Sequence, residues 1–293
     1  MEVLTNLING MSLGSVYAII ALGYTMVYGI AKMLNFAHGD VIMVGAYICF
    51  CSVSYLGLPA LAGVALSVVG CTLLGIVVER LAYKPLRNAP SLNVLITAIG
   101  VSYFLQNAAL IIMGSDPKSF SSIISLPALN LFDGKLTISA TAVLTIFACV
   151  VIMVALTMFT GKTKMGKAMR ACSEDRDAAQ LMGINVNSTI SMVFAIGSGL
   201  AAIAGVLMCL AYPTLMPTTG SMPGIKAFTA AVLGGIGSIP GAALGGVLLG
   251  IIEIFARAYI STQLADAVVF GVLIVILLIR PAGLLGKPVN EKV

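Results

Sequence analysis

The chain consists of long apolar segments separated by short polar ones. No charged residue falls in the ranges 3–31, 41–78, 88–115, 136–161, 178–225, 227–252 and 267–279. Most of these ranges exceed the roughly 20 residues that an α-helix needs to cross a bilayer, and two are long enough for a helical hairpin. The residues of 61–78 and 142–159 are apolar on every face, unlike the alternating segments of a β-barrel. The pattern therefore predicts an all-α, polytopic bundle of membrane helices.

The apolar segments predict a single membrane domain, 1–293, with eight or nine membrane segments. The expected helices are 5–30, 41–57, 60–80, 92–113, 137–159, 188–211, 225–237, 241–258 and 264–280. The first is expected to be a retained helix, because it lacks the positive leader of a signal peptide and is too long for a signal core. Polar residues interrupt 31–57, while 225–237 is short and followed by Gly and Pro, so we expect broken or re-entrant segments there.

Charge is scarce and unevenly distributed. Lys, Arg, Asp and Glu make up 9 % of the 293 residues, whereas a soluble domain carries about 25 %. This composition excludes a soluble enzyme, a nucleic-acid-binding protein and a disordered chain. Lys and Arg collect in 80–87, in 162–176 and after 279, which places these segments and the C-terminus in the cytoplasm.

The segment 114–135 is expected on the outer face, one span away from each of the first two basic loops. Within it, Asp133-Gly134 lies between two short alternating runs, and Asp-Gly supplies the positive-φ residues of a type I′ turn. A small β-hairpin is one interpretation, and an irregular loop that contains Asp-Gly is the other.

No motif for catalysis or metal binding is complete. Gly161-Lys162-Thr163 resembles the end of a phosphate-binding loop, but Leu156 occupies the position of the required first glycine. His38 is the single histidine, and the six cysteines fall mostly in apolar runs, where Cys behaves as a small hydrophobe. We therefore expect no enzyme activity, no metal and no cofactor, and any ATP that drives transport must bind another chain.

Polar residues inside apolar runs are candidates for a substrate path, because polar groups at membrane depth are costly unless they face protein or a cavity. Asn35, His38 and Asp40 form one cluster between two long runs, and Gln106 and Asn107 interrupt another run. Alternative interpretations are a short cytoplasmic turn for the first cluster and interhelical hydrogen bonds for the second.

The glycine-rich segment 234–250 is a further candidate. Gly237 is followed at spacings of four by two more glycines, and Pro240 is expected to break the helix. Ends of broken helices offer partial charges to a zwitterionic solute. The alternative is close helix packing without substrate contact.

The cytoplasmic loop 162–187 predicts an independent helix at 174–182. Ser173 is a suitable N-cap, the acids of the first turn (Glu174, Asp175 and Asp177) suit the helix dipole, and Gly183 suits the C′ position. A well-capped, charged helix in a chain with little other polar structure suggests docking to a partner. A merely solvated connector is the alternative.

Several segments together resemble one transporter family. Glu174, Ala178 and Gly183 fit the Glu-Ala-Gly pattern of the coupling loop in membrane subunits of ATP-binding cassette (ABC) importers. The segments ALGYTMVYGI (21–30), LNFAHGD (34–40), ITAIGVSYFLQN (96–107), ACSEDRDAAQLMGIN (171–185) and KAFTAAVLGGIGSIPGA (226–242) are similar to branched-chain amino acid permeases of the LivH type. The loop departs from the Glu-Ala-Ala sequence of that motif, because Asp175 and Arg176 follow the glutamate.

The resemblance implies a complex in the bacterial inner membrane that imports leucine, isoleucine or valine. The implied partners are a second, homologous permease, two cytoplasmic ABC ATPases and a periplasmic amino-acid-binding protein. It also implies ATPase coupling through the loop residues Glu174, Asp175, Arg176, Asp177, Ala178 and Gly183.

Two other functions remain open at this point. Permeases for urea and short amides share much of the pattern. An ion-coupled secondary transporter would need carboxylates near the membrane spans, and the carboxylates that could serve are Asp40, Glu79, Glu253 and Asp266.

Overall fold

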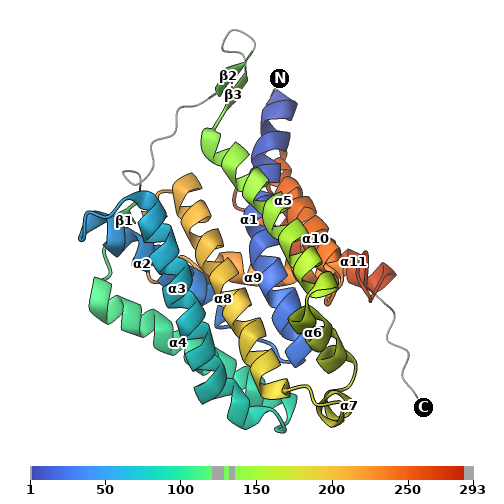
Figure 1. Ribbon diagram of the computed structural model, residues 1–293. Helices are drawn as coiled ribbons and strands as arrows, with labels where there is room; N and C mark the ends of the chain where they lie inside the picture. The colour runs from blue at the N-terminus through green and yellow to red at the C-terminus, as the bar shows by residue number, and fades with distance from the viewer. Residues whose placement is uncertain (1, 121–128, 132–135, 287–293) are drawn as a thin grey trace. The chain divides into compact units, whose positions relative to one another are not determined.

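The computed structural model describes residues 2–120, 129–131 and 136–286 (Figure 1). The chain divides into two compact units. The first consists of Met1–Thr25, Leu126–Ala155 and Lys226–Val293, and the second of Met26–Ser125 and Leu156–Ile225. Each is described by itself.

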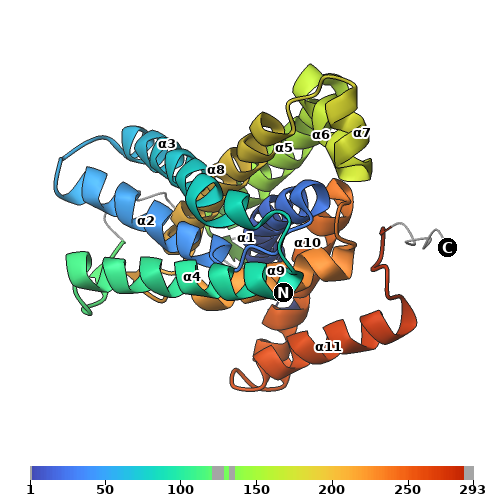
Figure 2. The same cartoon turned by 90° about the horizontal axis from the view of Figure 1, so that it is seen from below.

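The second unit is built on three mutually packed helices, α2 (His38–Ser54), α3 (Ala60–Val78) and α8 (Val186–Ala211). Helix α4 (Ser91–Met113) runs alongside α2 (Figure 2). Small residues let these backbones approach closely: a Cβ on Gly45 would lie 2.6 Å from the Cα of Ala202 on α8. Without a hydrophobic driving force between helices in lipid, such close packing supplies the association energy.

One short strand pair closes an end of this unit. Strand β1 (Lys118–Ser119) pairs antiparallel with β4 (Thr214–Leu215). Leu215 and the adjacent Phe120 are fully buried in an apolar cluster with Met43 and Tyr47 of α2. The strand pair thus holds the segment that follows α4 against the segment that follows α8, over the core of the unit.

The C-terminal end of α3 changes pitch rather than stopping. It continues as a π-helical turn, η1 (Glu79–Tyr83), and a 3₁₀ turn, η2 (Lys84–Leu86). Short π segments often occur at functional sites. Here the change of pitch brings Glu79 and Tyr83 into the protein interior, where both are 0 % exposed.

The first unit contains residues 2–25 of α1 (Glu2–Ala31) and most of α5 (Ala140–Lys162) and α9 (Ser221–Gly234). It also holds α10 (Ile239–Tyr259) and α11 (Ala265–Ile279). Glycines allow α1 and α10 to touch: a Cβ on Gly14 would lie 2.6 Å from the carbonyl oxygen of Val247.

Strands β2 (Leu129–Leu131) and β3 (Leu136–Ile138) pair antiparallel in this unit. The paired strands of the expected β-hairpin are therefore confirmed. Its turn, with Asp133-Gly134, lies outside the described residues.

Six of the described helices are long and apolar enough to span a membrane, and two shorter apolar helices, His38–Ser54 and Ala265–Ile279, accompany them. The prediction of an all-α, multi-pass bundle is confirmed at this level. The number of membrane segments, eight or nine, stays a prediction. The loop 162–187 differs from expectation, because it holds two helices instead of one.

Candidate functional site

The first helix of the loop 162–187 is α6 (Lys164–Glu174), which the sequence analysis missed. Thr163 caps it by accepting a hydrogen bond from the backbone amide of Gly166 at 2.9 Å. Met169 and Cys172 are buried where α6 packs on α8. This burial raises the pKa of the Cys172 thiol. Helix α6 is therefore packed on α8 and is not a merely solvated connector.

The second helix, α7 (Arg176–Leu181), begins two residues later than predicted. The expected N-cap, Ser173, is wrong: its hydroxyl lies in the last turn of α6 and donates to the carbonyl of Arg170. The N-cap is Asp175, whose carboxylate accepts from the amides of Asp177 and Ala178 at 2.9 and 3.0 Å. Asp caps at least as well as Ser and adds a favourable charge at the helix N-terminus, so it takes the position.

The end of α7 follows the prediction. Gly183 has a φ of 82°, and its amide donates to Gln180 while the amide of Ile184 donates to Ala179. These two bonds form a Schellman motif, which requires a left-handed residue at C′. Gly183 is confirmed as the C′ residue.

The outer face of α7 is exposed and mixed in character. Glu174, Asp177, Ala178 and Gly183 are all exposed. Leu181 and Met182 are 88 % and 82 % exposed, and the sequence analysis did not single them out. An available signal was that two large apolar side chains end an otherwise polar, solvated helix.

Glu174 contributes little to the stability of its own helix. It is the last residue of α6, not a first-turn residue of the docking helix as expected, and an acid at a helix C-terminus opposes the helix dipole. Helix stability therefore does not explain its place at the junction of α6 and α7, where it is free to contact a partner.

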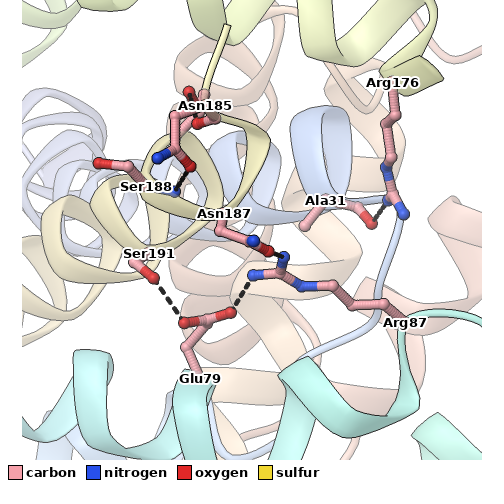
Figure 3. A network of polar contacts seen from close by, with 9 residues as sticks. Ala31, Glu79, Arg87, Arg176, Asn185, Asn187, Ser188 and Ser191 are labelled. Carbon is pink, nitrogen blue, oxygen red and sulfur yellow. Dashed lines mark hydrogen bonds and ion pairs between the residues drawn. The ribbon is translucent and has the colours of Figure 1, made fainter. Parts of the chain in front are cut away.

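Arg176 points the other way. Its guanidinium donates to the carbonyl of Ala31, the last residue of α1 (Figure 3). Burial, and secondarily the positive charge of Arg87, lower the pKa of Arg176 below its ordinary value. The structure thus separates Arg176 from the exposed residues with which the sequence analysis grouped it.

The predicted break between the first two helices is confirmed. Helix α1 ends at Ala31 and α2 begins at His38. The polar side chains there are within the protein: Asn35, His38 and Asp40 are 4 %, 1 % and 2 % exposed. Asn35 accepts a hydrogen bond from the hydroxyl of Tyr83 at 2.8 Å.

Gln106 joins this polar cluster, and Asn107 does not. The Gln106 amide donates to Asp40 at 2.8 Å and lies 3.3 and 3.2 Å from the hydroxyls of Ser102 and Ser221. Asn107 is exposed and donates to the carbonyl of Tyr103 on its own helix. Consecutive residues on a helix point in different directions, so only one of the pair can face α2.

The glycine-rich break lies in the first unit. Gly235 and Gly237 have φ values of 102° and 96°, which end α9 and turn the chain. Ser238 then caps α10 by accepting from the amide of Gly241 at 3.2 Å. Pro240 occupies the first turn of α10, where its missing amide costs nothing. Gly237 thus lies in an interruption between two helices, whereas Pro240 does not break a helix but lies in the first turn of α10, which follows the interruption.

A buried charged cluster in the first unit was not predicted as a site. Glu253 on α10 is 0 % exposed and accepts from Lys226 at 2.7 Å, from Tyr17 at 3.0 Å and from Arg257. Lys226 also pairs with Asp266 at 2.6 Å. The four charges sum to zero, so the cluster joins α1, α9, α10 and α11 without a net charge.

Among the described residues, no group of three or more His, Cys, Asp or Glu side chains could hold a metal ion. The chain combines helices of membrane length, two helix interruptions with polar side chains enclosed by protein, and a capped helix pair outside the spans. These are features of a multi-pass membrane permease.

The comparisons identify the family. Residues 6–278 match the family model "Branched-chain amino acid transport system / permease component". The chain belongs to this family, which confirms the resemblance seen in the sequence motifs. Its role is therefore that of a transport subunit and not of an enzyme.

Two bacterial relatives match over nearly their whole length. The high-affinity branched-chain amino acid transport system permease protein BraD of Pseudomonas aeruginosa is 46 % identical, over 99 % of this chain and 98 % of the relative. The corresponding protein LivH of Escherichia coli (strain K12) is 44 % identical, over 99 % and 97 %. A solved structure of PsaBC from Streptococcus pneumoniae in complex with Fab gives a TM-score of 0.49 at 14 % identity, covering 94 % of this chain and 91 % of that one. That likeness is too low to support a conclusion.

Proposed function

We propose that this chain is the membrane-spanning subunit of an ABC importer that carries leucine, isoleucine and valine across the bacterial inner membrane. Family membership supports the transport role and the solute class. The observation that carries the coupling role is α7, a short helix capped at both ends with its outer face exposed.

The proposed complex contains a second, homologous permease, two cytoplasmic ATPases and a periplasmic amino-acid-binding protein. The incomplete phosphate-binding motif at 161–163 supports the assignment of ATP hydrolysis to separate subunits. The basic loops and tail support a cytoplasmic C-terminus. Both compact units would then belong to one membrane domain, 1–293.

In this proposal the outer face of α7 docks on an ATPase subunit. Leu181 and Met182 offer apolar area that is costly to leave in water, and Glu174 and Asp177 provide charges around it. Asp175 and Gly183 act indirectly, because they cap the helix and fix its length. Ala178 leaves room for close approach of the partner's surface.

The substrate path is proposed to run past the polar cluster of Asn35, His38, Asp40 and Gln106. In the first unit, Gly237 and Pro240 are proposed separately as substrate-path residues, because the backbone near helix ends presents partial charges suited to a zwitterion. Asn107 has a smaller part in this scheme, because its amide is satisfied on its own helix.

Ion pairing of three of the four candidate carboxylates argues against ion coupling, whereas the fourth, Asp40, accepts a hydrogen bond from Gln106. Glu79 pairs with Arg87, and Glu253 and Asp266 pair with Lys226. The paired cation competes with a coupled ion for the same carboxylate oxygens.

The test is uptake of radiolabelled leucine into proteoliposomes that contain the chain with or without its partner subunits and ATP. Uptake is expected only with ATPases, ATP and the binding protein together. Replacing Leu181 and Met182 by Ser should remove the ATPases from the purified complex. The matched control is Leu56→Ser, at a side chain that is 69 % exposed outside the cytoplasmic loop. Appreciable uptake by the chain alone under an ion gradient would refute the proposal.

A further inference from the structure

Helix α7 has an inner face as well as the outer one. Arg176 and Ala179 lie three residues apart and so share one side of the helix. Ala179 is 4 % exposed and Arg176 is partly buried, in contrast to the exposed Asp177 and Ala178 between them. Because Asp175 fixes the N-terminus of α7, the direction in which Arg176 leaves the helix is also fixed.

The partner of Arg176 is a helix end. The carbonyl of Ala31 belongs to the last residue of α1, where backbone carbonyls lack intrahelical donors and the helix dipole is negative. An arginine there supplies both the donor and the opposite charge. The next residue, Lys32, has a φ of 52°, so α1 stops there and the chain enters the 32–37 break. Arg176 therefore holds the point at which α1 becomes the polar break.

The break is also held from within the membrane part of the unit. Tyr83 of η1 donates to Asn35 at 2.8 Å. The same η1 turn carries Glu79, which pairs with Arg87 and accepts from Ser191 of α8 at 2.6 Å. Figure 3 shows Arg87 between Glu79 and Asn187, to which it also donates. These bonds tie η1 and the segment after η2 to α8.

The two attachments differ in what they connect. The Glu79–Arg87 pair, with Ser191 and Asn187, joins parts of the α3–α8 packing to each other. Arg176 instead joins the cytoplasmic loop to the end of α1 across 145 residues of sequence. Displacement of α7 would thus act on Ala31 through Arg176, while Tyr83 and the Glu79 network keep their positions.

We propose that Arg176 is a positioning residue that transmits movement of α7 to the 32–37 break, and not a contact to the ATPase. The proposal rests on the proposed coupling function of α7 and specifies where its motion goes. Arg176 was expected to take part in the contact with the ATPase. In this proposal its role is instead directed inward, toward α1.

The test uses the complete transporter in proteoliposomes, with Arg176→Gln as the main variant and Arg176→Lys as the charge-retaining one. Arg170→Gln is the matched control, because Arg170 also donates to a carbonyl but only locally, to Gly161 at 3.2 Å. Three quantities are measured: copurification of the ATPases, ATP hydrolysis, and leucine carried per ATP. A spin label at Lys32→Cys, the exposed first position of the break, reports nucleotide-dependent change.

Arg176→Gln is expected to keep the ATPases and their basal hydrolysis, while leucine carried per ATP falls about tenfold. A hydrogen bond to a charged group shifts an equilibrium by at least that factor. The nucleotide-dependent signal at position 32 should disappear in Arg176→Gln, recover in part in Arg176→Lys and persist in Arg170→Gln.

Two results would overturn the inference and leave the proposed function standing. One is loss of the ATPases from Arg176→Gln, which would place Arg176 at the partner interface. The other is unchanged leucine per ATP in an assembled Arg176→Gln complex. Absence of ATP-driven uptake with the unaltered chain would instead refute the proposed function itself.

Discussion

The charged cluster around Glu253 gives the sharpest stability prediction. Glu253→Ala removes a fully buried carboxylate that accepts from Lys226, Arg257 and Tyr17. Lys226, whose side chain is 5 % exposed, then remains buried without its main counter-charge, whereas the Arg257 side chain is 35 % exposed. The chain is expected to insert and fold, but with a lower free energy of unfolding.

The magnitude follows from the partners that remain. Removing one member of a buried ion pair costs about 3–5 kcal/mol. We expect the lower end, about 3 kcal/mol, because Lys226 keeps Asp266 at 2.6 Å. Tyr17→Phe removes one hydrogen bond to a charged group and should cost about 1.5–3 kcal/mol. The Asp266 side chain is 43 % exposed, so Asp266→Asn should cost under about 1 kcal/mol.

The assay is equilibrium unfolding of the purified chain with increasing SDS in mixed micelles, followed by far-UV circular dichroism because the chain has no Trp. A second comparison replaces both Glu253 and Lys226 by Met. Exchange of a buried ion pair for apolar side chains is often neutral. The double variant should therefore lose less stability than the sum of the losses in Glu253→Met and Lys226→Met. Strict additivity, or a cost below about 1 kcal/mol for Glu253→Ala, would refute the assigned coupling.

Three further predictions concern backbone and thiol. Gly183→Ala forces an L-residue into a left-handed conformation at a cost of about 1–2 kcal/mol, and it should lower ATP-driven leucine uptake. The control Gly161→Ala adds a Cβ that meets no atom within 4 Å and should leave uptake unchanged. Equal uptake by the two variants would contradict the Schellman assignment. Gly14→Leu should drive α1 into the α10 backbone and reduce the yield of folded chain in a gel-filtration assay, whereas Gly100→Leu, facing open space, should leave it unchanged. Burial raises the pKa of the Cys172 thiol, so less thiolate exists at a given pH. Maleimide labelling should therefore be slower than at an exposed cysteine and should speed up only as the pH is increased. Labelling as fast as that of a model thiol at neutral pH would show that Cys172 is not buried in the packing of α6 on α8.

Helix positions and interruptions were largely predictable from the sequence because lipid as a solvent imposes strong constraints. Charge-free runs fixed where α3, α4, α5 and α8 lie to within a few residues. Glycine and proline marked the interruption between α9 and α10, since their backbone preferences act locally. Gly183 was predictable for the same reason, because a C′ residue needs only its own φ.

The start of α7 was not predictable because two residues competed for one role. Ser173 and Asp175 are both good N-caps, and the sequence alone favoured the first. The choice depends on α6, which packs on α8 through Met169 and Cys172 and so extends to Glu174. Tertiary packing therefore moved the cap by two residues, and it makes Arg176 the first residue of α7.

The candidate site shows the same division between what is local and what is distant. The sequence identified Asn35, Asp40 and Gln106 as polar residues that lipid would not tolerate unpaired, and each proves to be hydrogen-bonded in protein. Their partners could not be read from the chain, because Tyr83 lies 48 residues from Asn35 and Gln106 lies 66 from Asp40. In a bilayer, an unpaired polar group costs more than the entropy of bringing two distant segments together, so each such residue constrains two helices. The few polar residues in the apolar runs therefore determine which helices adjoin. Replacing one of them, or its hydrogen-bond partner, by an apolar residue keeps the run apolar but changes the helix packing as well as the site.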